Sequence, residues 1–344
     1  MWNIFKNWFN KEKSISNFLE TPEYFTGALL DQRKPEEKTN DIQFKDIVGT
    51  ANAVNWNKTS YRSFPPYNQF QTYSCGANAL AKALGIAYST RYGVYVPFSR
   101  VNIYQRRYGA PSAGMTLWDM FNIIGNGVTL EQLTPETFNN DEDIDKIIID
   151  QFKKDVGAVF KTTGGVYLPN DIDLIASTIQ TTGKGVILLT WFTASEWSAK
   201  TPVIQNRWLG SSDPISLRHF VVAVDYVMFN GMKYLVVEDS AWFGGYNQRL
   251  ISEDWIKNRI VGAAYPMNFK FTVTNVNRSY DGVTIISAQK CLQDLGFFPT
   301  NVAFAEVVGN VTRQSLIKFQ AKYGLAQTGT LSDETKIKLH QLFP

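Results

Sequence analysis

Cysteine and histidine are scarce in this sequence of 344 residues, which contains two of each. Two cysteines, at positions 75 and 291, cannot build a disulfide framework, so we expect free thiols and a fold formed without oxidation. A zinc or iron site needs three or four clustered ligands, so we expect no Cys/His metal site. No glycine-rich phosphate loop occurs between a predicted strand and helix. The sequence therefore predicts no cofactor.

Strong net charge and long apolar runs are also missing. The net charge is +3, and no dense Lys/Arg run is present, so we expect no nucleic-acid partner. No stretch has the length needed to span a membrane. Residues 1–9 are aromatic and amphipathic but lack the apolar core and cleavage site of a signal peptide. Residues 2–9 predict a short helix, either docked on the protein or lying on a membrane surface.

The composition that remains is that of a globular protein with 44% hydrophobic and 19% charged residues. The length allows two or three domains. Residues 1–50 are mostly polar, with scattered apolar residues, and predict an arm over a domain, a pro-like segment or a tail. We place one mixed domain at residues 51–273, a linker at 274–282 and a small helical domain at 283–344.

Helical patterns come first in the mixed domain and strand patterns follow. Helices are predicted at residues 76–85 and 116–124 and after Pro169-Asn170-Asp171. Strands are predicted at residues 185–191, 219–226, 234–238 and 264–273. This order is typical of an α+β domain. Residues 287–295, 312–323 and 332–342 predict three short helices, which would form a small bundle.

Cys75 lies where a proline-containing loop leads into the first predicted helix. The unpaired amide groups and the positive end of the dipole at a helix N-terminus favour a thiolate. Cys75 is therefore the candidate nucleophile. The alternative is a buried structural cysteine, because free cysteine is among the most buried residue types.

His219 begins one predicted strand and Asp239 follows the next. If the two strands pair around Phe229-Asn230-Gly231, both residues lie near the same end of the sheet. A carboxylate there could hold one ring nitrogen and leave the other for a thiol. The alternative is a histidine with a purely structural hydrogen bond at a strand end.

Several segments resemble the papain (C1) family of cysteine peptidases. They are Asn55-Trp56-Asn57, Asn68-Gln69 with Ser74-Cys75, Ala113-Gly114, His219 with its apolar strand, and Glu238-Asp239-Ser240-Ala241-Trp242. The resemblance covers about residues 52–268. It implies a two-lobed domain, with a helical lobe followed by a β-sheet lobe.

The resemblance also implies roles for individual residues. Cys75, His219 and Asp239 would form the catalytic triad, and Gln69 would bind the oxyanion with the backbone N–H of Cys75. Ala113 and Gly114 would pair with the substrate backbone. Trp242 would line the substrate site.

The sequence departs from the family pattern at four places. Gly76 stands where the family has an aromatic residue, and Asp239 stands where it has asparagine. Trp242 is displaced by one residue. The family's disulfide near the site would need cysteines at about Thr72 and Pro111, and both are missing.

The C-terminal segment resembles the peptidoglycan-binding domain type 1. The matching residues are Cys291-Leu292-Gln293-Asp294-Leu295-Gly296, Gly309-Asn310-Val311-Thr312, Phe319-Gln320, Gly324-Leu325, Thr328-Gly329 and Thr335. The resemblance implies a peptidoglycan partner for residues 283–344, with structural roles for Cys291 and His340. A generic three-helix adaptor without glycan affinity is the alternative.

These patterns together predict a papain-like cysteine peptidase that is directed to the bacterial cell wall. The substrate would be a protein or the peptide stems of peptidoglycan. A wall-binding tail without a signal peptide indicates a phage-like protein, delivered within a virion or by lysis. Two alternatives remain: an acyl transferase with the same triad, and an inactive protein that keeps the fold as a binding or structural scaffold. The sequence predicts neither the peptide specificity nor the oligomeric state.

Overall fold

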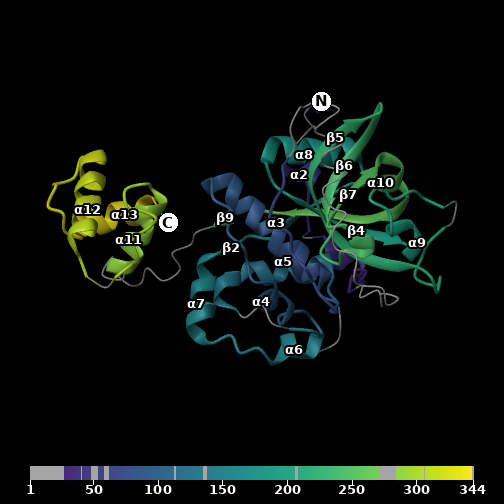
Figure 1. Ribbon diagram of the computed structural model, residues 1–344, viewed down its shortest axis with the longest axis horizontal. Helices are drawn as coiled ribbons and strands as arrows, with labels where there is room; N and C mark the ends of the chain where they lie inside the picture. The colour runs from purple at the N-terminus through teal and green to yellow at the C-terminus, as the bar shows by residue number, and fades with distance from the viewer. Residues whose placement is uncertain are drawn as a thin grey trace. The chain divides into compact units, whose positions relative to one another are not determined.

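The computed structural model describes residues 27–39, 41–47, 53–57, 62–111, 114–134, 138–205, 208–270, 284–305 and 307–342. The chain divides into two units, Met1–Phe269 and Lys270–Pro344, and Figure 1 labels most of their helices and strands. The helix predicted at residues 2–9 and the linker predicted at 274–282 lie outside the described residues.

The helices of the first unit include the three that were predicted. The α-helices are α2 (Phe44–Ile47), α3 (Cys75–Tyr92), α4 (Arg100–Tyr104), α5 (Leu117–Gly125), α6 (Asp141–Lys146), α7 (Gln151–Val159), α8 (Ile172–Thr182), α9 (Ala194–Trp197) and α10 (Glu253–Arg259). Three short 3₁₀ helices accompany them: η1 (Pro35–Lys38), η2 (Glu131–Leu133) and η3 (Phe243–Gly245). The predicted helices correspond to α3, α5 and α8.

Helix α3 is the central helix of this unit. It is buried continuously from Cys75 to Ala87, because alanine and glycine let neighbouring elements pack against every side of it. The helix ends at Gly93, which adopts the left-handed conformation (φ 74°) and donates its N–H to the Ser89 carbonyl. It is longer than predicted, and its first residue is Cys75.

Seven strands form the main sheet in the order β1-β3-β8-β4-β5-β6-β7. Their bounds are β1 (Ile42–Gln43), β3 (Gly165–Leu168), β4 (Val186–Phe192), β5 (Leu217–Phe229), β6 (Met232–Glu238), β7 (Gln248–Ser252) and β8 (Ile260–Pro266). Strands β1 and β3 are parallel, and the other neighbours are antiparallel. Strands β4, β5 and β6 correspond to three of the predicted strands.

The strand predicted at residues 264–273 has wrong bounds. Strand β8 starts earlier, at Ile260, and ends at Pro266. After it, β9 (Phe269–Lys270) pairs with β2 (Lys161–Thr162) in a separate two-stranded sheet. Proline has no N–H to continue the ladder, and an apolar run does not reveal where a chain changes sheets.

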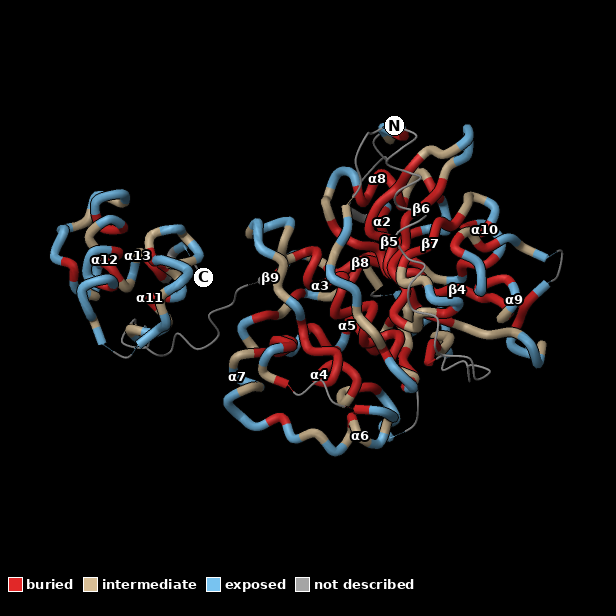
Figure 2. Tube along the Cα trace, viewed as in Figure 1, coloured by how far each residue is buried: buried red, intermediate tan, exposed pale blue. Residues whose placement is uncertain are grey.

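Strand β5 divides the core because its side chains alternate between two faces. Phe220 and Val222 face α3, whereas Val221 and Ala223 belong to the apolar cluster that includes Trp255 of α10 and residues of α8. Figure 2 shows buried residues concentrated in the sheet and in α3. The N-terminus of α3 and the start of β5 are therefore held by packing from both sides.

The second unit consists of α11 (Ile285–Asp294), α12 (Asn310–Lys322) and α13 (Asp333–Leu342), as predicted. Its core contains Leu292, Phe298, Leu316, Phe319 and Leu339. Across both units, no helix in the described part of the chain has the length and apolar character to cross a membrane.

Candidate active site

Cys75 and His219 occupy element ends that packing brings together. Cys75 is the first residue of α3, and His219 is the third residue of β5. Helix α3 packs against β5, and both side chains are fully buried. The thiol of Cys75 is close enough to contribute to the pKa of the His219 ring.

The two ring nitrogens of His219 have different surroundings. Nε2 donates to Oδ1 of Asp239 at 2.8 Å, since an ionised carboxylate can only accept. Nδ1 is buried and has no aligned hydrogen bond among the described residues. This arrangement fixes the ring by one nitrogen and leaves the other available to Cys75.

Asp239 is the most heavily bonded side chain of the site. Besides His219, its oxygens accept hydrogen bonds from the indole N–H of Trp197 (2.8 Å), Nε of Arg249 (2.9 Å) and the backbone N–H of Ala241 (2.8 Å). Its own N–H donates to the Asn247 carbonyl at 2.8 Å. These donors fix the carboxylate in an ionised form.

Electrostatics separate the pKa values of His219 and Asp239. Burial alone would lower the pKa of His219, but the Asp239 carboxylate outweighs it and raises the pKa to about 9, with a smaller contribution from Cys75. Burial alone would raise the pKa of Asp239, but the charges on His219 and Arg249 hold it below its ordinary value. A protonated His219 facing an ionised Asp239 is therefore stable at neutral pH.

Gln69 is fixed in the loop that leads to Cys75. Its side-chain Nε2 donates to the Thr72 carbonyl at 2.9 Å, and its Oε1 accepts from the Ser240 hydroxyl at 2.9 Å. Its backbone N–H also donates to the Ser240 carbonyl at 2.9 Å. The loop before Cys75 is thereby joined to the segment that carries Asp239. The oxyanion role of Gln69 stays a prediction.

The predicted substrate-binding residues are only partly described. Ala113 lies outside the described residues. Gly114 has a left-handed backbone (φ 93°) and donates its N–H to the Tyr104 hydroxyl. Trp242 also has a left-handed backbone (φ 56°), and its indole N–H donates to the Tyr67 carbonyl at 2.9 Å. Their contacts with a substrate stay predictions.

The described part of the N-terminal arm pairs with the segment that contains Gly114. Ala28 and Met115 form a parallel bridge, in which Met115 N–H donates to the Gly27 carbonyl (2.7 Å) and Leu29 N–H donates to the Met115 carbonyl (2.8 Å). A Cβ at Gly27 would lie 1.6 Å from the carbonyl oxygen of Tyr73, so only glycine fits there. The arm therefore lies against the segment just before Cys75.

The contacts of Gly76 explain why no aromatic residue follows the cysteine. A Cβ at Gly76 would lie 2.8 Å from the Met120 methyl, 3.1 Å from Met115 Cβ and 3.4 Å from the Phe220 ring. Side chains from α5, the segment before it and β5 thus fill this space.

Thr72 and Pro111, which stand at the positions of the family's disulfide, form hydrogen bonds instead. The hydroxyl of buried Thr72 bonds to the Gln69 carbonyl (2.5 Å) and to the Ser74 hydroxyl (2.6 Å). The Pro111 carbonyl accepts from Arg107 at 2.9 Å. Both cysteines of the chain are free thiols.

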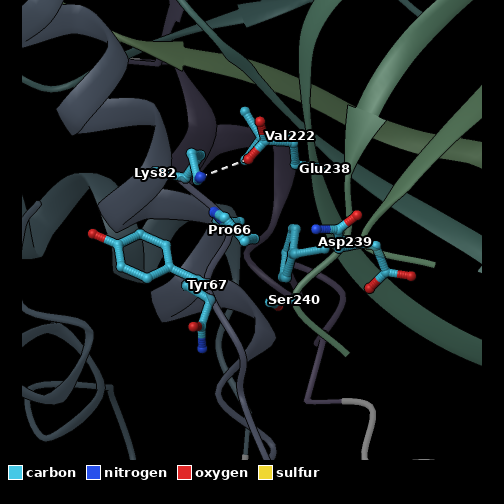
Figure 3. Close-up of a pocket in the computed structure, with 11 residues that line it drawn as sticks. Pro66, Tyr67, Lys82, Val222, Glu238, Asp239 and Ser240 are labelled. Atoms are coloured by element: carbon cyan, nitrogen blue, oxygen red, sulfur yellow. Dashed lines mark ion pairs between the residues drawn. The ribbon is translucent and has the colours of Figure 1, made fainter. Parts of the chain in front are cut away.

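A small cavity of about 10 Å³ lies beside the site, between α3 and the ends of β5 and β6. Figure 3 shows Lys82 of α3 pointing toward Glu238, the residue before Asp239. Their charged atoms are 2.5 Å apart and almost completely buried. A cavity of this size holds about one water molecule and no substrate.

Arg249 and Trp197 are site residues that the sequence did not suggest. They come from β7 and α9, 10 and 42 residues from Asp239. No motif marks them, because only the packing of the sheet brings them to Asp239. Among the described residues, no group of three or more His, Cys, Asp or Glu could hold a metal ion.

Comparison with known proteins agrees with this architecture. Residues 281–339 match the family model described as "Putative peptidoglycan binding domain". Among solved structures, xylellain, a cysteine protease from Xylella fastidiosa, matches with a TM-score of 0.54 at 15% identity, over 72% of this chain and 97% of that one. Procathepsin B S9 from Trypanosoma congolense matches with a TM-score of 0.51 at 14% identity, over 77% and 97%.

A third similar structure is digestive procathepsin L 3 of the Tenebrio molitor larval midgut, with a TM-score of 0.50 at 20% identity, over 62% of this chain and 69% of that one. No curated protein matches the sequence. At these identities the likeness establishes the fold. The predicted α+β class is confirmed, with the fold of papain-like cysteine proteases and a C-terminal helical unit that matches the binding-domain family.

Proposed function

We propose that this protein is a cysteine peptidase in which Cys75 is the nucleophile and His219 its acid–base partner. The observation that carries the proposal is the placement of the His219 ring, which is held at Nε2 by Asp239 and has Nδ1 left for Cys75. A thiolate at the start of α3 is further favoured by the positive end of that helix.

The reaction follows from these positions. The Cys75 thiolate attacks the peptide carbonyl carbon, and the electron pair of the C=O bond moves to oxygen. When the C–N bond breaks, His219 gives its proton to the leaving amine, and a thioester remains on Cys75. Water then attacks the thioester, His219 takes its proton, and the C–S bond breaks to release the carboxylic acid.

We assign the oxyanion to the Gln69 amide and the Cys75 backbone N–H. The bonds from Gln69 to Thr72 and Ser240 support this assignment because they hold the amide in the loop that precedes Cys75. Ala113 and Gly114 would hold the substrate backbone, and Trp242 would line the substrate site.

We further propose that the C-terminal unit directs the peptidase to the cell wall. The match of residues 281–339 to the binding-domain family supports peptidoglycan as the partner. The substrate would then be a wall protein or the stem peptides of peptidoglycan. In this proposal residues 51–273 are the catalytic domain, and residues 283–344 are the binding domain.

A hydrolysis assay tests the proposal. Purified cell walls and a mixture of wall proteins would be incubated with the full-length protein and with Cys75→Ala, and new amino groups and peptides would be mapped by mass spectrometry. The proposal predicts new peptide ends with the wild type and none with the variant. Equal products from both proteins would contradict it, and products joined to an added amine would indicate an acyl transferase.

A further inference from the structure

Arg249 makes the second ion pair of Asp239. It is fully buried in β7, and its Nε lies 2.9 Å from Oδ2 of Asp239. Its other nitrogens donate to the carbonyls of Ala199 (2.7 Å) and Phe243 (2.5 Å), and its guanidinium lies 4.8 Å from the ring centre of Trp197. The guanidinium is therefore fixed by all three of its nitrogens.

A second cationic partner changes how a buried aspartate acts beside a catalytic histidine. A buried carboxylate is costly unless another charge balances it. A carboxylate that faces only the imidazolium would also stabilise the proton on the ring. The ring would then be a poor acid for the leaving amine. A neutral asparagine, which the resembled family has at this place, avoids both difficulties.

We propose that Arg249 is a positioning residue that lets aspartate serve here: it holds the carboxylate with one oxygen toward His219 and takes up part of its negative charge. This inference rests on the proposed function of Cys75 and His219. The geometry supports a division of labour, since Oδ1 accepts from His219 while Oδ2 accepts from Arg249 and Trp197.

Several charged or titratable groups face this pair from the surrounding elements. Cys75 of α3 contributes to the pKa of His219, and the ring of Tyr246 lies 5.8 Å from the Arg249 guanidinium. Lys200 lies 6.0 Å from the same Tyr246 ring, and Glu238, next to Asp239, is paired with Lys82. The variants described below leave these groups unchanged. A shift in the pKa of His219 therefore reports the change at Asp239 or Arg249.

The test is the pKa of the His219 ring, measured by NMR on the full-length protein and its variants. The chain has two histidines, so a His219→Gln variant assigns the signal. Arg249→Met should raise the pKa by at least about half a unit, a roughly threefold change in proton affinity, because the carboxylate keeps its full charge. Arg249→Lys keeps the charge and should stay near the wild type.

The double variant makes the test sharper. Asp239→Asn leaves the Arg249 charge buried without a carboxylate, so it should give the lowest pKa and the lowest melting temperature of the set. Adding Arg249→Met to Asp239→Asn should restore part of the pKa of His219 and part of the melting temperature. The predicted order of the pKa of His219 is R249M, wild type, D239N/R249M and then D239N, from highest to lowest.

Arg259→Met is the matched control. Arg259 is also buried, and it forms a 2.7 Å ion pair with Glu196. Its loss should lower the melting temperature without moving the pKa of His219. Equal pKa values in R249M and the wild type would overturn the inference. If R249M does not fold, a D239N/R249M protein that is no more stable than D239N, with no higher pKa, would overturn it instead.

The same measurement distinguishes a failure of the proposed function from a failure of the role of Arg249. An ordinary pKa for His219 in the wild type would contradict the pairing of His219 with Asp239 and Cys75, and the proposed function with it. A raised pKa that Arg249→Met leaves unchanged would contradict only the role of Arg249.

Discussion

His219 is completely buried and has a charged partner, Asp239. Burial lowers the pKa of His219, and the charge on Asp239 raises it. The pKa of about 9 in the folded protein, against an ordinary value of 6.5, means that Asp239 prevails. A raised pKa stabilises the fold fully below pH 6.5, and this contribution is lost as the pH rises through about 9.

We therefore expect the free energy of unfolding to fall between pH 6.5 and pH 10 by up to about 3 kcal/mol more in the wild type than in His219→Gln. Urea unfolding of both proteins at the two pH values measures this difference. Groups that do not interact with His219 cancel in the comparison. An equal loss in both proteins would show that the His219–Asp239 pair does not stabilise the fold.

Gly76 gives a steric prediction at the same scale. Gly76→Trp would force an indole into space held by Met115, Met120 and Phe220, and overpacking of this kind costs about 1–3 kcal/mol. Gly76→Ala is the control, because its methyl needs only the flexible end of Met120 to move aside and Met115 Cβ, at 3.1 Å, to shift by a few tenths of an ångström. Thermal unfolding should rank G76W well below G76A. A G76W protein as stable as G76A would show that the space is open.

The residues of the site differ in how far the sequence could predict them. Cys75, His219 and Asp239 lie at element ends that local patterns reveal, so their neighbourhood could be expected from a helix start and a hairpin. Arg249 and Trp197 are an ordinary strand residue and an ordinary helix residue by pattern. Their role depends on the packing of β7 and α9 around Asp239, which has no local signal.

At the scale of elements, the hairpin of β5 and β6 carries His219 and leads into Asp239. Its pairing aligns Val222 with Glu238, so Asp239 emerges beside the start of β5. The turn at Asn230 and Gly231, both with positive φ, explains why the sequence predicted this hairpin correctly. The bounds of β8 could not be predicted in the same way, because a change of partner sheet is a long-range event.

The N-terminal arm is the element most open to test. Its parallel bridge to Met115 and its contact with Tyr73 support the hypothesis that the arm limits access to Cys75. Gly27→Val places a side chain where the Tyr73 carbonyl lies and should release the arm. We expect Cys75 to react with a small thiol reagent at least about tenfold faster in this variant.

Thr39→Ala is the control for the arm. Thr39 is an exposed arm residue whose hydroxyl bonds only locally, to the Glu36 carbonyl. In the Thr39→Ala variant, Cys75 should react with the thiol reagent at the same rate as in the wild type. Equal rates in G27V and the wild type would remove the hypothesis that the arm covers the site.

At the scale of the whole molecule, the two units have separate cores and separate matches to known proteins. The C-terminal unit depends on Gln320, which is fully buried and bonds to Thr328, the Thr330 carbonyl, Thr335 and the Gly329 N–H. Its loss would leave the buried Gly329 N–H without an acceptor and remove one partner of buried Thr335, at a cost of roughly 2 kcal/mol.

Gln320→Ala should therefore weaken wall binding while the first unit keeps its reactivity. A pull-down with purified cell walls would compare the full-length protein, Q320A, a truncation at residue 275 and the exposed-surface control Gln327→Ala. Retention should fall for Q320A and the truncation only. Unchanged retention of the truncated protein would remove the wall-binding proposal.

In the proposed function Cys75, and not Cys291, is the reactive thiol. Burial raises the pKa of Cys291 to about 12, so this thiol should be inert at neutral pH. The most direct test is to treat the full-length protein and Gly27→Val with an epoxide that alkylates thiols and to map the adduct by mass spectrometry. We expect modification of Cys75, and His219→Gln should slow this modification by about a hundredfold or more. Modification of Cys291 alone, or of neither cysteine after the arm is released, would contradict it.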